Sequence, residues 1–411
     1  MNDDATDPQP NLGLIEGFGI ALEYMIVDAE TFDVRPIADR ALVENGEIVS
    51  ELERGPIAWS NELVSHVIEL KTNGPAATLD GLDALFQASV VDLDAVLALH
   101  GARLLPTAMH PWMNPLTDTV LWPHDYSDVY EAFDRIFGCK GHGWSNLQSM
   151  HINLPYRGDD ELRRLHDAIR IVLPLLPALA ASSPFVEGAP TALLDNRLEH
   201  YRNNCRRLPA VTGHVVPERV DGEASYRRVV LGAIAEAIAP HDPDDILDPE
   251  WVNARGAIVR FVRDSIEIRV IDVQEHPAAD LAIAGLVVAT LRALIEGRLS
   301  DPSELSLHET VLEQVFLTAI RDADRAIVDE PALLRCFGLP ERPVPMADVW
   351  RHLAAETLDE AQRAAPALAT ILEHGPLARR MRRAATADPA SLRALARELA
   401  DCLHHGRPFL P

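Results

Sequence analysis

The chain has 411 residues, 47% hydrophobic and 24% charged, so it can bury a large core. Its formal net charge of -26 and pI near 4.9 argue against an open nucleic-acid-binding face. Four scattered cysteines favour a reducing, cytoplasmic setting, and the apolar stretches are too interrupted for a convincing membrane span. Residues 1–12 are predicted to be a flexible tail, and residues 13–411 a single domain.

Strands and helices are expected in mixed order from residue 15 onward. Strands are predicted at 15–28, 62–71, 102–111, 146–155 and 257–273. Helices are predicted at 78–100, from 158 with a break at Pro174 and Pro177, at 277–297, and through most of the chain after about 303. Residues 189–225 carry little pattern and are expected to form a long functional loop or an insertion. The order predicts an α+β fold: a largely antiparallel sheet with helices on one face and the other face open.

Alternation of side chains along the strands predicts where polar groups gather. In "RFVRDSIEIRVIDVQEHP", residues 260–277, Glu267, Arg269 and Ile271 share one face of an otherwise apolar strand. Three further strands each place a carboxylate or an imidazole on one face: Glu23, Glu69 and His151. If these strands belong to one sheet, the four acidic or imidazole side chains converge on its open face.

Carboxylates gathered with an imidazole suit hard divalent cations, since Mg²⁺ prefers oxygen ligands and Mn²⁺ accepts mixed ones. Arg269 beside them could hold a phosphoryl or carboxylate group bidentately. The same spacing also fits a solvated strand face with a modest ion pair and a structural histidine. The arginines of "RNNCRRLP" fit either an anion site or a surface stripe. Spacing alone does not choose between these interpretations.

Several segments, taken in order, resemble the bacterial glutamate–cysteine ligase family of the second type, the carboxylate–amine ligases. They include "GIALEYMIVDAETFDVRP", "NELVSHVIELKTNGP", "SMHINLP", "ASSPF", "YRNNCRRLP" and "IEIRVIDVQ", and they span about residues 15 to 405. "ASSPF" and the E-x-R-x-x-D-x-Q strand are the most specific. The resemblance implies a curved antiparallel sheet, as in glutamine synthetase catalytic domains, with helices on the convex face and the metals, ATP and glutamate on the concave face.

The activity that the resemblance implies is ATP-dependent ligation, as in glutathione biosynthesis. ATP phosphorylates the γ-carboxylate of glutamate or a similar acid, and an amine such as that of cysteine attacks the acyl phosphate. The implied cofactors are ATP and Mg²⁺ or Mn²⁺, and the implied partners are small molecules, without nucleic acid or membrane; a homo-oligomer is left open. By position, the metal ligands would be Glu23, Glu69, His151 and Glu267. Arg269 and Glu267 would be catalytic, and Arg269 and Arg202 would contact ATP or substrate.

One departure from the family pattern lies in the first strand. The family has two carboxylates two residues apart in this strand, whereas this chain has Ala21 and Glu23. Loss of one carboxylate lowers the negative charge around a bound cation. This departure motivates one alternative to an active ligase, a catalytically impaired or regulatory homologue that binds nucleotide or amino acid. A second alternative stays open as well, a metal-dependent hydrolase that uses the same acidic strands.

Overall fold

A twisted eight-stranded sheet lies at the centre of the computed structural model, which describes residues 12–411. The predicted tail, residues 1–12, lies outside the described residues except for Leu12. The strand order is β11–β12–β8–β1–β6–β5–β4, β7 also pairs with β1, and all pairs are antiparallel. The strands are β1 (Gly19–Asp28), β4 (Glu51–Arg54), β5 (Ile57–Asn61), β6 (Val67–Thr72), β7 (Ala102–Leu105), β8 (Ser149–Pro155), β11 (Ala257–Arg260) and β12 (Ser265–Asp272).

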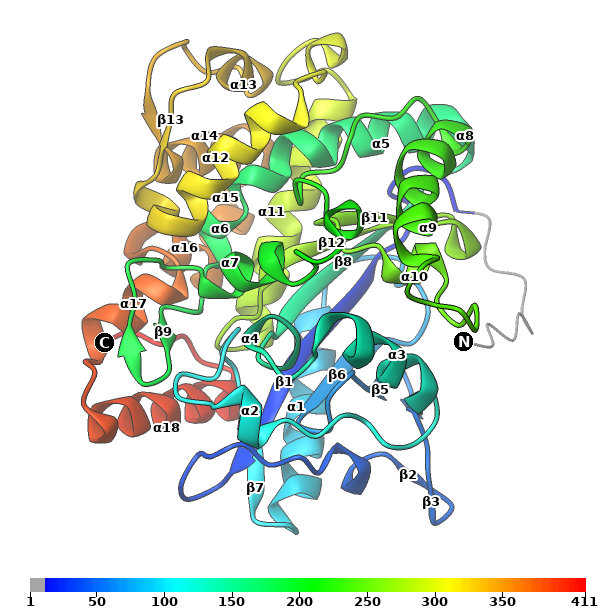
Figure 1. Ribbon diagram of the computed structural model, residues 1–411. Coiled ribbons are helices and arrows are strands. Elements are labelled where there is room, and N and C mark those ends of the chain that lie inside the picture. The colour runs from blue at the N-terminus through cyan, green and yellow to red at the C-terminus, as the bar shows by residue number, and fades with distance from the viewer. Residues whose placement is uncertain (1–11) are drawn as a thin grey trace.

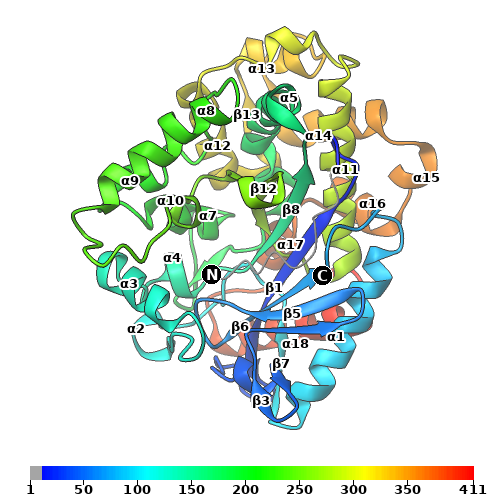
Figure 2. The same ribbon diagram turned by 90° about the vertical axis from the view of Figure 1, so that its right-hand side faces the viewer.

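Helices lie on both sides of this sheet (Figures 1 and 2). The long helices α1 (Leu82–Ala98) and α11 (Pro277–Ile295) cover one face, and α5 (Gly158–Val172) packs against α11 and β12. Four shorter helices stand over the other face: α3 (Ser127–Phe137), α4 (His142–Ser145), α7 (Asn196–Asn203) and α10 (Pro249–Val252). The α+β class with an antiparallel sheet is confirmed, and the face that we expected to be open is partly covered.

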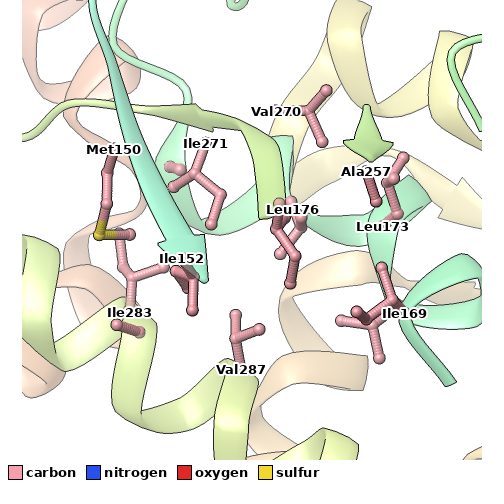
Figure 3. Packing of buried hydrophobic residues seen from close by; sticks show 14 of the residues in the cluster. Met150, Ile152, Ile169, Leu173, Leu176, Ala257, Val270, Ile271, Ile283 and Val287 are labelled. Atoms are coloured by element: carbon pink, nitrogen blue, oxygen red, sulfur yellow. The ribbon is translucent and has the colours of Figure 1, made fainter. Parts of the chain in front are cut away.

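The apolar face of the sheet packs against α11. Figure 3 shows Met150 and Ile152 of β8 and Ile271 of β12 beside Ile283 and Val287 of α11. Burial of each such aliphatic side chain stabilises the fold by roughly 1.5–3 kcal/mol. Helix α11 is long and apolar enough to cross a membrane by length and composition, but most of its residues are buried within the fold. It is therefore the central core helix.

The remaining elements surround this core, and helices predominate after residue 303. Three small antiparallel pairs join β2 (Val43–Glu44) to β3 (Glu47–Ile48), β9 (Phe185–Val186) to β10 (Ala189–Pro190), and β13 (Ile327–Val328) to β14 (Val344–Pro345). The other helices are α2 (Pro115–Asp118), α6 (Pro177–Ala180), α8 (Glu223–Tyr226), α9 (Gly232–Ile238), α12 (Glu309–Asp322), α13 (Pro331–Cys336), α14 (Met346–Thr357), α15 (Glu360–Arg363), α16 (Pro366–His374), α17 (Leu377–Ala384) and α18 (Pro389–His405).

Several predicted boundaries differ from the observed ones. The strand expected at 257–273 is a hairpin, β11 and β12, whose turn passes through Asp264 with a φ of 44°. The strand expected at 62–71 starts only at Val67, and the loop expected at 189–225 contains α7. The break after α5 at Pro174 is confirmed, because a proline cannot continue the helical hydrogen-bond ladder.

Candidate active site

The polar face of the central strands lines a cavity of about 480 Å³. The four short helices that stand over it supply aromatic walls, among them Tyr130, Trp144, Tyr201 and Trp251. A second cavity, of about 330 Å³, adjoins the first and shares part of its wall. Volumes of this size fit small-molecule substrates.

Strand register decides which side chains meet on this face. Glu23 of β1 lies opposite Glu69 of β6, while Ala21 lies opposite both His151 of β8 and Lys71 of β6. Residues two apart on a strand share a face. The pair of Glu23 and Glu69 therefore lies on the same face as the neighbouring row of Lys71, Ala21 and His151. The structure thus brings Glu23, Glu69 and His151 together from three strands that are far apart in sequence.

Glu23, Glu69 and His151 form a donor set that a metal ion could occupy. One ligand atom from each lies within 4.8 Å of the others. Glu23 Oε1 is 3.6 Å from His151 Nε2, and Glu69 Oε1 is 4.0 Å from His151 Nδ1. Backbone N–H and Oγ of Ser149 donate to Glu23 Oε2, at 2.6 and 2.8 Å, and Ser60 Oγ donates to Glu69 Oε2 at 2.8 Å. These hydrogen bonds fix both carboxylates, and two oxygens with one imidazole fit Mg²⁺ or Mn²⁺.

Glu267 and Arg269 of β12 lie on the same face and form an ion pair, with Arg269 Nε 3.1 Å from Glu267 Oε1. Burial would raise the pKa of Glu267, but the positive charge of Arg269, with further basic groups nearby, lowers it to about 2. Burial would lower the pKa of Arg269, but Tyr201 and the nearby carboxylates raise it. Both groups therefore stay ionised at neutral pH, and the guanidinium is available to an anion in the cavity.

The chain is similar to known proteins over most of its length. The model of glutamate–cysteine ligase family 2 matches residues 17–398. The chain belongs to this family. An uncharacterized protein of Archaeoglobus fulgidus is 38% identical over 67% of this chain and 73% of its own length. A Sorangium cellulosum protein with the provisional name glutamate–cysteine ligase 2 is 26% identical over 86% of this chain and 85% of its own.

The same fold occurs in a solved structure, the glutamate–cysteine ligase of Francisella tularensis in complex with AMP. It has a TM-score of 0.61 and 13% identity, and the match covers 96% of this chain and 90% of that one. The sequence-based assignment to glutamate–cysteine ligase family 2 is confirmed by the family match.

Glu62 is a cavity residue that the sequence analysis missed. Burial, with the carboxylates of Glu23 and Glu69 nearby, raises the pKa of Glu62 well above its usual range. A cation in the cavity would favour its ionised form. Strict alternation would place position 62 on the face opposite Glu69, but β6 begins only at Val67, so alternation does not extend to Glu62.

The structure does not bring every predicted residue to the metal-ligand group or to the cavity. Glu267 is tied to Arg269 and lies outside the three-residue group. Among the described residues of α7, Arg197 and Tyr201 line the cavity, whereas Arg202 does not and instead pairs with Glu199 at 3.4 Å. The contact of Arg202 to ATP or substrate stays a prediction. The sequence analysis did not name Arg197, because this segment was read as a loop without a helical face.

The "ASSPF" segment and the D-x-Q end of β12 form one buried network behind the cavity. Asp272 accepts hydrogen bonds from Ser182 N–H at 2.8 Å and Ser183 Oγ at 3.0 Å, and it pairs with Arg197 Nε at 2.5 Å. Gln274 Nε2 donates to Ala180 O at 2.7 Å. The network fixes α7 against β12, and Arg197 also donates to the carbonyl oxygen of Arg269 at 3.2 Å.

Ile271 lies on the opposite face of β12 from the one that alternation predicts. Alternation placed it on the polar face with Glu267 and Arg269, but the pairing of β12 with β8 shifts register between Ile268 and Ile271. This irregularity turns Ile271 into the core beside Met150, as Figure 3 shows.

Proposed function

We propose that the protein is an ATP-dependent carboxylate–amine ligase that joins glutamate through its γ-carboxylate, or a similar acid, to cysteine or another amine. The observation that carries the proposal is the meeting of Glu23, Glu69 and His151 with the Glu267–Arg269 pair in one cavity of a glutamate–cysteine ligase family fold. The AMP in the Francisella tularensis relative supports a nucleotide as one substrate.

The residues of this chain would act mainly by positioning and by charge complementarity. Glu23, Glu69 and His151 would hold Mg²⁺ or Mn²⁺, and such an ion, when bound, neutralises phosphate charge. Arg269, held by Glu267 and by its own backbone contact to Arg197, would face the transferred phosphoryl group. A guanidinium fixed before the reaction stabilises developing charge without reorganising.

The aromatic walls would exclude water from an activated acyl phosphate. Tyr130, Trp144 and Trp251 belong to α3, α4 and α10 and line the cavity, where they would limit access of bulk solvent. Shielding matters because an acyl phosphate reacts with water as well as with an amine.

The four cysteines are buried and unpaired, which supports a reducing compartment such as the cytoplasm.

The experiment is an ADP-release assay with ATP, Mg²⁺, a panel of acids that includes glutamate, and a panel of amines that includes cysteine. Turnover that requires both an acid and an amine supports the ligase. Hydrolysis of a phosphoester without an amine supports the hydrolase alternative instead.

A catalytically impaired homologue is the second candidate, and Ala21 favours it. Ala21 lies between Lys71 and His151 on the polar face, where a carboxylate would add a further ligand. Nucleotide binding without turnover for any acid and amine pair would support this candidate.

A further inference from the structure

Lys71 stands out because this chain uses lysine very rarely. Only two of its 37 basic residues are lysines, Lys71 and Lys140. Lys140 is exposed, away from the cavities, whereas Lys71 is partly buried on the polar face of β6. A lysine ammonium is a compact point charge that contacts phosphate without the planar fork of an arginine.

Lys71 lies at the border between the two cavities. Its side chain lines both of them, on the same strand face as Glu69. The side chain is 29% exposed, and Nζ lies 2.7 Å from Glu51 Oε2 and 3.6 Å from Glu69 Oε2. The residues common to both cavity walls are Glu51, Glu69, Lys71, His151, Arg263 and Glu267.

The residue opposite Lys71 leaves its ammonium accessible. Ala21 is its cross-strand neighbour and lines the second cavity. A methyl group there neither pairs with the ammonium nor fills the space above it. The side chain of Lys71 is therefore open to an anion in the second cavity.

We propose that Lys71 contacts the terminal phosphoryl group of a nucleoside triphosphate as that group passes to the carboxylate of the second substrate. This assignment rests on the proposed ligase function. Two substrates bound in adjoining cavities can exchange a group only at the shared border, and Lys71 lies there. In this step the bond between the γ-phosphorus and the bridging oxygen breaks, and ADP leaves with the electron pair. A carboxylate oxygen forms the new bond to phosphorus, and Lys71 exchanges no proton.

The test compares Lys71→Met with Lys71→Arg, and uses Lys140→Met as the matched control. Calorimetric titration measures the affinity of each variant for AMP, ADP and a non-hydrolysable ATP analogue in the presence of Mg²⁺. We expect Lys71→Met to weaken binding of the triphosphate by about 10- to 100-fold, the usual effect of losing one charge-assisted contact. AMP affinity should stay unchanged, which also shows that the variant is folded. Lys71→Arg should recover part of the loss, and Lys140→Met should match the wild type.

Two results would overturn the assignment while leaving the ligase function intact. The first is that Lys71→Met binds the triphosphate with the same affinity as the wild-type protein. The second is that Lys71→Met loses affinity for AMP, ADP and the triphosphate by the same factor. A wild-type protein that binds no triphosphate would instead overturn the proposed function, and this assignment with it.

Discussion

Replacing Asp272 by asparagine tests how the wall of the candidate active site is held. Asp272 is fully buried, and its carboxylate pairs with Arg197, whose side chain is only 2% exposed. Asparagine has nearly the same shape but lacks the charge. The guanidinium of Arg197 would then stay buried without its counter-ion, while the serine contacts from Ser182 and Ser183 would weaken.

The expected cost follows from the burial of this pair. Removing one partner of a buried ion pair typically costs about 3–5 kcal/mol. Unfolding entropy is about 2 cal/mol/K per residue, so for 411 residues this cost lowers Tm by about 3–6 °C. Because Arg197 also positions the backbone of Arg269, we expect turnover to fall by about 10- to 100-fold as well.

Scanning calorimetry and the ADP-release assay measure the two effects. The matched control is Asp92→Asn, since Asp92 lies 4.0 Å from Arg54 with both side chains well exposed. An exposed pair of this kind is worth less than about 1 kcal/mol, so Tm should change by about 1 °C or less. The double variant Arg197→Met/Asp272→Asn should be less destabilised than the sum of the two single variants. A Tm for Asp272→Asn equal to that of the control, or strict additivity in the double variant, would refute this reasoning.

Three further predictions address the cavity itself. Glu23→Gln should weaken Mn²⁺ binding by about 10- to 100-fold, as measured by electron paramagnetic resonance. The control Glu44→Gln, on the exposed strand β2, should leave Mn²⁺ affinity unchanged. Equal Mn²⁺ affinities in the two variants would exclude Glu23 as a ligand. Ala21→Glu places a carboxylate between Lys71 and His151 and should raise Mn²⁺ affinity in the same assay; an unchanged titration would show that position 21 does not reach the ion. The folded-state pKa of Glu267 is lowered from 4.5 to about 2, so its ionised form stabilises the fold above pH 4.5, and this stabilisation is lost as pH falls toward 2. Glu267→Gln should therefore reduce Tm at pH 6 more than at pH 3, and a pH-independent difference would contradict the ionised pair.

Alternation along strands could place Glu23, Glu69, His151 and Arg269 on polar faces because β1, β6, β8 and the first part of β12 are regular there. It could not reveal which strands are neighbours, since register depends on contacts between distant segments. The resemblance supplied that arrangement.

The errors have local physical causes. Ile271 was misplaced because a register shift in β12 breaks the period of two. Glu62 was missed because it precedes the strand, and Arg197 because α7 is short, polar and without a clear apolar period. The aromatic walls were not predicted either, since α3 lies between the strands expected at 102–111 and 146–155, where no helix was predicted.

Isotope transfer tests the central claim most directly. With glutamate labelled by ¹⁸O in its γ-carboxylate, or with whichever acid supports turnover, the phosphate released during ligation is analysed by mass spectrometry. Passage through an acyl phosphate predicts one ¹⁸O atom in each phosphate formed. Phosphate that carries no label, although ADP is released, would contradict the account, because the phosphoryl group would then have gone to water.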